Sequence, residues 1–250
     1  MKRTSGQTTG LAWTSGLWIL AMAFPCQAQE LTVSLGDGGS IALTSIQLLV
    51  LVSVLSILPG LAIMITCFPF LVTVLSILRQ AIGLQQSPPN MLIVSLALFL
   101  TYFVMEPVFS SAWQNGVVPF SNGEVTAEQA FEKAMKPFRV FMSANTDPDT
   151  FAELAAVGGR KGEQPTLSEN SPASLLIPSF MLSEIKRAFQ IGFLIYLPFL
   201  IIDMVVAAVL MSMGMMMVPP AIVSLPFKLG FFVIVDGWSL VAQALVRSYF

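Results

Sequence analysis

Residues 41–78 contain no charged side chain. The hydrocarbon core of a bilayer is about 30 Å thick, and an α-helix crosses it with about 20 residues. The uncharged run is therefore longer than one simple crossing needs. The composition agrees, because 55% of all residues are hydrophobic, only 10% are charged, and the mean hydropathy is +0.79. Soluble domains carry about 25% charged residues, so this chain is membrane-inserted or derived from a membrane protein.

Residues 1–28 have the pattern of a secretory signal peptide. The chain begins with the basic pair Lys2-Arg3, followed by a short apolar core at residues 17–24. Pro25 then breaks the helix, and Cys26-Gln27-Ala28 is a small-residue cleavage pattern. We predict cleavage after Ala28. An uncleaved anchor is the alternative, but the apolar core is shorter than the roughly 20 residues of a span. A lipoprotein signal is disfavoured because Pro25, rather than Gly or Ala, precedes Cys26.

Residues 29–113 are predicted to form the N-terminal apolar helices. Pro59-Gly60 falls in the middle of the uncharged run, and since proline removes a backbone donor we expect a kink or a hairpin there. Arg79 ends the run, and a second apolar helix is expected over residues 91–113. That helix contains Glu106, which needs a partner or water unless Arg79 and Glu106 serve only as anchors at helix ends.

Residues 114–177 are predicted to be a polar, mostly helical insert outside the cytoplasm. The insert is too long to be oriented by its own charges. Its side follows instead from the signal peptide and an even number of crossings before it. Within the insert, Thr126 is the predicted N-cap of an amphipathic helix. The helical period places Phe131, Met135 and Phe138 on the expected buried face.

Residues 178–250 are predicted to form a helical hairpin of two apolar segments joined at residues 213–220. A charge at the centre of a spanning helix costs roughly 2.5–3.5 kcal/mol on insertion scales. The charges inside this hairpin should therefore pair with each other, with another subunit or with a wet cavity, and an internal ion pair is one of the possibilities. They are Asp203, Lys228 and Asp236, preceded by a polar collar of Glu184, Lys186 and Arg187 that could also be an interface anchor.

Methionines gather at the turn of this hairpin. Met213, Met215, Met216 and Met217 surround Gly214, just before Pro219-Pro220. Methionine is flexible and polarizable, so it can seal against varied shapes. Gap-filling in an ordinary core is the alternative, but this clustering favours a soft, movable loop.

Several classes of function are disfavoured by what the sequence lacks. It contains no histidine and only two cysteines, Cys26 and Cys67, so we expect no metal site, no cofactor and no catalytic centre built on histidine. The formal net charge of −2 provides no basic field for a phosphate backbone. Nucleic acid is therefore not an expected partner.

Five sequence motifs in the C-terminal region are similar to those of the FliP family of flagellar biosynthetic proteins, which includes counterparts in virulence type III secretion systems. They are SEIKRAFQIGF at 183–193, LPFLIID at 197–203, MGMMMVPP at 213–220, LPFKL at 225–229 and VDGW at 235–238. The resemblance extends to Pro88-Pro89-Asn90 and to the signal peptide. It departs from the family at Pro69-Phe70, where the family has a basic residue after the phenylalanine.

The resemblance implies a non-enzymatic core subunit of a protein export gate in the bacterial inner membrane, at the flagellar basal body. It implies assembly with further FliP-like copies and with FliQ-like and FliR-like subunits, beside FlhB-like and FlhA-like export proteins, into a channel for unfolded flagellar proteins. Its helices would sit in an assembly raised above the bilayer plane. Two sets of residues receive roles: a pore gasket of Met213, Met215, Met216 and Met217, and subunit-contact charges at Glu184, Lys186, Asp203, Lys228 and Asp236.

The fold expected is an all-α membrane protein of kinked helical hairpins with a small helical insert. Three other functions are compared with the flagellar gate. One is the same role in a virulence type III system. Another is an intramembrane aspartyl protease using Asp203 and Asp236, which is disfavoured because the local sequences lack the Tyr-Asp and Gly-x-Gly-Asp contexts of such enzymes. A small-solute transporter predicts an internal repeat, and the two apolar blocks show none.

Overall fold

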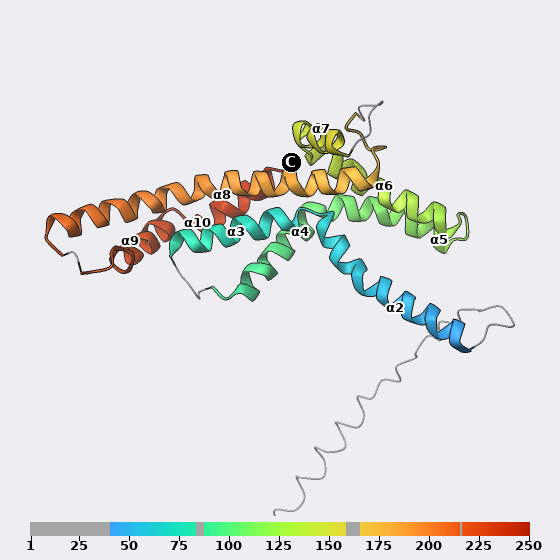
Figure 1. Ribbon diagram of the computed structural model, residues 1–250, viewed down its shortest axis with the longest axis horizontal. Coiled ribbons are helices and arrows are strands. Elements are labelled where there is room, and N and C mark those ends of the chain that lie inside the picture. The colour runs from blue at the N-terminus through green and yellow to red at the C-terminus, as the bar shows by residue number, and fades with distance from the viewer. Residues whose placement is uncertain (1–40, 84–87, 159–165, 216) are drawn as a thin grey trace, which may run out of the picture. The chain divides into compact units, whose positions relative to one another are not determined.

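The computed structural model describes residues 41–83, 88–158, 166–215 and 217–250, and these residues are helical with no strand among them. The all-α expectation is therefore confirmed. The helices in chain order (Figure 1) are α2 Ile41–Met64, α3 Phe68–Ile82, α4 Asn90–Ala112, the π-helical turn η1 Trp113–Val117, α5 Val118–Ser121, α6 Ala127–Asn145, α7 Pro148–Val157, α8 Ala173–Ser212, α9 Pro220–Ile234 and α10 Gly237–Arg247. The contacts described below belong to the compact unit Ser53–Phe250.

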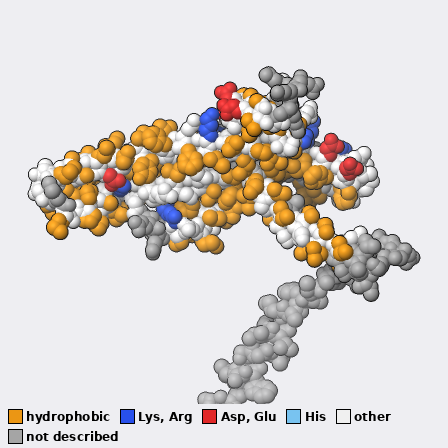
Figure 2. Space-filling view, in the orientation of Figure 1, with side chains coloured by type: hydrophobic (Ala, Val, Ile, Leu, Met, Phe, Trp, Pro, Cys, Tyr) orange, Lys and Arg blue, Asp and Glu red, His pale blue; other side chains and the backbone are white. Residues whose placement is uncertain are grey.

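Three helical stretches are long and apolar enough to cross a membrane: Ile46–Met64, Asn90–Ser121 and Ala173–Ser212. The pair α9 and α10 could form a fourth span, although it is bent by 62°. Figure 2 shows hydrophobic side chains over much of the visible surface of α8 and α9. The chain therefore fits a membrane protein with several crossings. The predicted signal peptide, residues 1–28, lies outside the described residues.

The break in the first apolar block falls at residues 65–67 and not at Pro59-Gly60. Helix α2 continues through Pro59 to Met64, so of the kink or hairpin expected at Pro59-Gly60 the hairpin is wrong. Thr66 ends the helix instead: its hydroxyl donates to the carbonyl of Ile63 at 2.7 Å and accepts from the backbone N–H of Phe68 at 3.3 Å. Proline at the start of α3 suits the first turn of a helix, where its missing donor has no partner to lose.

Helix α3 lies at the centre of the core. It packs against α8 and α4, and its buried face consists of Phe70, Leu71, Val74, Leu75, Leu78, Ala81 and Ile82. The contact with α8 is closest at Gly192, where an added Cβ would lie 2.4 Å from Cδ1 of Ile77. Only glycine lets the two helices approach this far without moving Ile77.

The helix that was expected to end near residue 113 continues through η1 and α5 to Ser121. Gly116 in η1 crosses α6 closely, since an added Cβ would lie 2.5 Å from the Cβ of Ala134. Helix α6 begins as predicted, with Thr126 as N-cap in a reciprocal capping box with Gln129. The predicted buried face is wrong at Phe131, whose side chain is 67% exposed, because Ala130 and Met142 carry the contacts.

The second arm of the C-terminal hairpin is two helices rather than one continuous segment. Asp236 adopts a left-handed conformation with φ of 50° between α9 and α10. The next residue must be glycine, because a Cβ on Gly237 would lie 2.2 Å from the ring of Phe232. The chain therefore turns by 62° at this point.

Candidate functional site

The methionine-bearing tip of the C-terminal hairpin begins with a Schellman motif at the end of α8. The backbone N–H of Met215 donates to the carbonyl of Leu210 at 3.0 Å, and that of Gly214 donates to Met211 at 3.1 Å. This motif needs a left-handed residue, and Gly214 supplies it with φ of +73°. The position of the glycine among the methionines is therefore a structural requirement of the turn.

The methionines of the tip point outward. Met213 is 66% exposed, Met215 is 42% exposed and Met217 is 97% exposed, whereas Met216 lies outside the described residues. Beside the loop an apolar cavity of about 680 Å³ opens between α8 and α9, lined by Val205, Val209, Leu210, Met213, Met215 and Phe227 among others. Because these thioether side chains are exposed and flexible, they can contact another surface without a change in the hairpin backbone.

Two of the predicted charges pair inside the hairpin. The Nζ of Lys228 lies 2.6 Å from Oδ2 of Asp203 and donates to the carbonyl of Ala81 at 3.1 Å. The hydroxyl of Ser224 donates to Oδ1 of Asp203 at 2.5 Å. Lysine and aspartate thereby join α9, α8 and α3. The internal ion pair considered from the sequence is formed, so neither charge is isolated in the apolar hairpin.

Asp236 is placed differently. Its side chain is exposed and does not cap α10, and within the described residues it has no ion pair. Asp203 is held by Lys228 and Ser224, so the two carboxylates are not brought together as a proton-sharing pair. This arrangement gives no support to an aspartyl protease, which needs paired carboxylates.

A second polar cluster lies deeper, around Glu184 on α8. The carboxylate of Glu184 is fully buried and accepts a hydrogen bond from the hydroxyl of Tyr249 on Oε2. Its Oε1 has no hydrogen-bond partner in the described part of the chain, and the guanidinium of Arg187 lies 3.9 Å away. Burial raises the pKa of the Tyr249 hydroxyl, with a further contribution from the Glu184 charge. The tyrosine therefore remains a donor to this carboxylate.

Arg187 holds the C-terminal segment with Tyr249 against the core by a hydrogen bond and by cation–π contacts. It donates to the carbonyl of Ser248, and its guanidinium lies 4.9 Å from the ring of Tyr249 and 5.2 Å from that of Phe70. The tyrosine ring also meets Phe70 edge-on, with the centroids 5.5 Å apart. Sequence reasoning missed this role of Tyr249, because Glu184 and Tyr249 are distant in the chain. An aromatic residue with a hydroxyl in an apolar region was the only available signal.

Lys186 makes a more exposed pair. Its Nζ lies 2.6 Å from Oδ2 of Asp147, which also accepts from Thr150 and caps α7. The hydrogen bond from Lys186 lowers the pKa of the Asp147 carboxyl, and the bond from Thr150 adds to this effect. The backbone N–H of Asp147 donates to Ser183 at 2.9 Å. Together these contacts connect the start of α7 to α8.

No group of three or more His, Cys, Asp or Glu side chains that could hold a metal is found in the residues described. The polar clusters instead resemble structural networks, because their charged groups are directed at one another. Their chemistry is that of contacts between helices.

Comparison with known proteins identifies the family. The family model described as the FliP family matches residues 51–245. The chain belongs to the FliP family. The flagellar biosynthetic protein FliP of Caulobacter vibrioides is 49% identical over 217 residues, covering 87% of this chain and 81% of that protein. FliP of Rhizobium meliloti is 44% identical over 229 residues, covering 92% of this chain and 92% of that protein. FliP of Bacillus subtilis is 44% identical over 206 residues, covering 82% of this chain and 92% of that protein.

The FliP resemblance inferred from the C-terminal motifs is thus confirmed, and the chain is a flagellar biosynthesis protein of this family. The structure explains part of the motif pattern. SEIKRAFQIGF contains Glu184, Arg187 and Gly192, which form the buried cluster and the close contact with α3. In LPFKL the lysine is the partner of Asp203, and in MGMMMVPP the glycine forms the Schellman turn.

Proposed function

We propose that this FliP-family chain is a core subunit of the flagellar type III protein export gate in the bacterial inner membrane, at the basal body. It assembles with further FliP-like copies and with FliQ-like and FliR-like subunits into a channel for unfolded flagellar proteins, beside FlhB-like and FlhA-like proteins. Family membership and the three apolar spans support this proposal. The relatives named above are flagellar, which favours this role over a virulence secretion system.

The observation that carries the proposal is the tip of the α8–α9 hairpin. A loop fixed at its base by the Schellman motif projects exposed thioethers from an apolar rod. Several such tips brought together would close an opening with soft, deformable side chains, because methionine adapts its shape without polar requirements. We therefore assign the pore gasket to Met213, Met215, Met216 and Met217.

The outer faces of the hairpin support assembly with other subunits. Phe189, Phe193 and Ile201 on α8 are each about 60% exposed, so α8 presents a long apolar face. Such a face is covered either by lipid or by protein partners. We assign subunit-contact roles to the five charges: Asp236 and Lys186 contact partners directly, whereas Glu184, Asp203 and Lys228 fix the shape of the contact face.

Replacing the four gasket methionines together by alanine tests the proposal. The purified gate in liposomes should become measurably leakier to small solutes, because shorter side chains no longer fill the opening. Met91→Ala is the matched control, since Met91 is also exposed but lies at the start of α4. Unchanged permeability of the quadruple variant, with a complex of normal mass, would count decisively against a gasket.

A further inference from the structure

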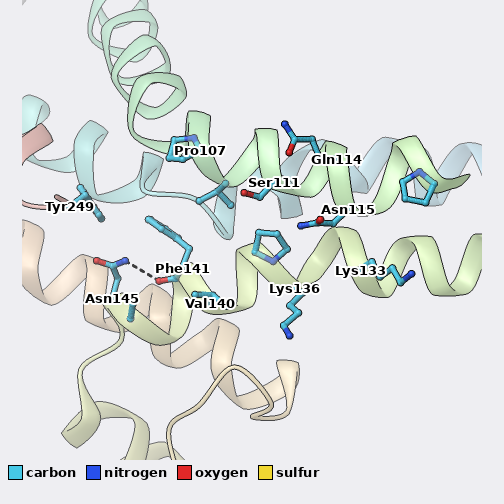
Figure 3. Close-up of a pocket in the computed structure, with 14 residues that line it drawn as sticks. Pro107, Ser111, Gln114, Asn115, Lys133, Lys136, Val140, Phe141, Asn145 and Tyr249 are labelled. Atoms are coloured by element: carbon cyan, nitrogen blue, oxygen red, sulfur yellow. Dashed lines mark hydrogen bonds between the residues drawn. The ribbon is translucent and has the colours of Figure 1, made fainter. Parts of the chain in front are cut away.

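A groove of about 850 Å³ lies between α4–η1 on one side and α6 on the other (Figure 3). Its walls include Pro107, Ser111, Gln114, Asn115 and Val140, and Tyr249 stands at one end. The groove is separate from the methionine tip and touches the buried Glu184 cluster only through Tyr249. Its size is that of a pocket for a large side chain and its neighbours.

The groove is built by backbone features of both helices. At Gly116 and Ala134 the two elements touch, so the walls are held at a fixed separation there. The π-helical turn η1 carries Gln114 and Asn115 into the lining. π-helical turns are rare and occur frequently at functional sites. A partly polar floor is therefore available to a partner.

The groove has a basic edge. Lys133 and Lys136 line it, and both side chains are exposed. Lys136 reaches Glu169 only at 3.7 Å across a solvent-exposed gap, and Lys133 has no ion-pair partner in the described part of the chain. Exposed pairs of this kind contribute little. The lysines are therefore free to meet acidic groups of a docking partner.

The same helix presents a complementary patch on its other side. Phe131 is 67% exposed, and the exposed residues Glu128 and Glu132 both lie to one side of it, at about 60° and 100° around the helix. Among the described residues neither glutamate has an ion-pair partner. Val140 lines the groove nine positions after Phe131, and at about 100° per residue the two point to opposite sides of α6. An aromatic side chain with two acids beside it thus faces away from Val140, in a groove edged by two lysines.

We propose that Phe131 of one copy of this chain inserts into the α4–η1/α6 groove of the next copy, with Glu128 and Glu132 meeting Lys133 and Lys136. This inference rests on the proposed function, in which several copies assemble. Aromatic anchors in pockets dominate interface energies, and opposite charges set the register. Because Phe131 and Val140 point to opposite sides of α6, the contact is head-to-tail. Contacts of this type generate rings when the rotation closes.

Charge reversal tests the contact in the full gate, expressed with the neighbouring subunits and sized in detergent. K133E/K136E and E128K/E132K should each weaken association of copies at least about tenfold, because like charges would then meet. The variant with all four changes should restore the assembly, since every pair is exchanged and the pattern within α6 is kept. Failure of the fourfold variant to recover, with both double variants folded by circular dichroism, overturns the proposal.

Disulfide trapping gives an independent result. In a background of Cys26→Ser and Cys67→Ala, the pair F131C/V140C should yield a ladder of disulfide-linked copies on oxidation. Nine residues of α-helix separate the two positions by roughly 13 Å, too far for a bond within one chain, which requires Cα atoms closer than about 7 Å. Cross-linked dimers with F131C alone would indicate face-to-face packing and contradict the proposal. A cross-link to a different gate subunit would also contradict the proposal.

Failure of assembly and failure of this one contact give different results. If the unmodified chain forms no species larger than one copy when all gate subunits are present, assembly itself is wrong. If it assembles normally and F131A, the charge reversals and the cysteine pair all behave as the unmodified chain, only this contact is wrong. Val157→Ala provides the matched control, because Val157 is a highly exposed apolar residue on α7 outside both surfaces.

Discussion

The ammonium group of Lys228 lies 2.6 Å from the carboxylate of Asp203, and this pair joins α9 to α8 within an apolar hairpin. The lysine also reaches the carbonyl of Ala81, so the pair connects to α3. An ion pair in such surroundings is retained at a desolvation penalty, and it fixes which helix faces meet.

Lys228→Leu should destabilise the protein by about 3 kcal/mol, the lower end for breaking a buried pair, because Asp203 remains 30% exposed and can recruit water. Asp203→Leu should be similarly harmful. The double variant should recover most of the loss, since two apolar side chains leave no unpaired charge. Thermal unfolding in detergent measures the cycle, and strictly additive losses would contradict the pairing.

Tyr249→Phe should lower stability by about 1–3 kcal/mol, because the buried carboxylate of Glu184 loses its donor. The ring contacts with Phe70 and Arg187 remain in this variant. In a Glu184→Gln background the same substitution should matter less, since a neutral amide is easier to leave without that donor. An equal effect in both backgrounds, measured by unfolding, would rule out the hydrogen bond as the cause.

Gly192→Ala should cost about 1–3 kcal/mol, because the new methyl group overlaps with Cδ1 of Ile77. Ile77→Val removes that δ-methyl group. In an otherwise unmodified chain it should be mildly destabilising, whereas in the Gly192→Ala background it should restore stability. Unfolding midpoints of the four proteins decide the matter: no recovery in the double variant would place the strain elsewhere.

Gly214→Ala should destabilise the end of α8 by about 1–2 kcal/mol, because the residue has φ of +73° and alanine is strained there. Asparagine tolerates this conformation better. Gly214→Asn should therefore lie between glycine and alanine in stability. Amide exchange at Met213 and Met215 reports on the turn directly, and equal protection in all three proteins would refute the requirement.

The contact between Lys186 and Asp147 should weaken at low pH. The pKa of Asp147 is lowered from 3.8 in the folded chain. Its contribution to stability is therefore complete above that ordinary value and is lost as the pH falls through the lower folded value. The effect should be small, since the pair is exposed. Asp147→Asn should abolish this part of the acid sensitivity, which unfolding curves between neutral pH and about pH 3 can resolve.

Local signals predicted much of the fold. The helix start at Thr126 was predictable because a good N-cap residue directly precedes an amphipathic pattern, and the structure adds the reciprocal bond from Gln129. The break at residues 65–67 was missed because proline, as at Pro59, is a stronger helix breaker by sequence than threonine, as at Thr66. Apolar helices nevertheless tolerate proline when neighbouring groups satisfy the backbone. Phe131 was assigned to the core because helical period identifies an apolar side chain but not the surface it meets.

The candidate site was predictable only where methionines or charged residues lie close together in the sequence. The methionines and the individual charges were visible as sequence motifs, whereas their partners were not. Asp203 meets Lys228 across a hairpin turn, and Glu184 on α8 meets Tyr249 beyond α9 and α10. Sequence spacing predicts contacts within one helix, and nothing in one sequence sets the rotation of two helices about each other. Asp236 shows the same limit, because it has a left-handed conformation beside Gly237, whose contact with Phe232 one sequence does not reveal.

The exposed thioethers of the hairpin tip also have a redox chemistry. Met213 and Met217 are open to solvent, whereas Met105 and Met142 are buried in the core. Oxidation to the sulfoxide turns a flexible apolar side chain into a polar one, and accessible sulfur atoms react first. An oxidant would thus modify the tip while the helical core remains reduced. Met91, at the start of α4, is 76% exposed and shares this sensitivity. The side chains best suited to a soft seal are therefore also among those open to oxidative damage.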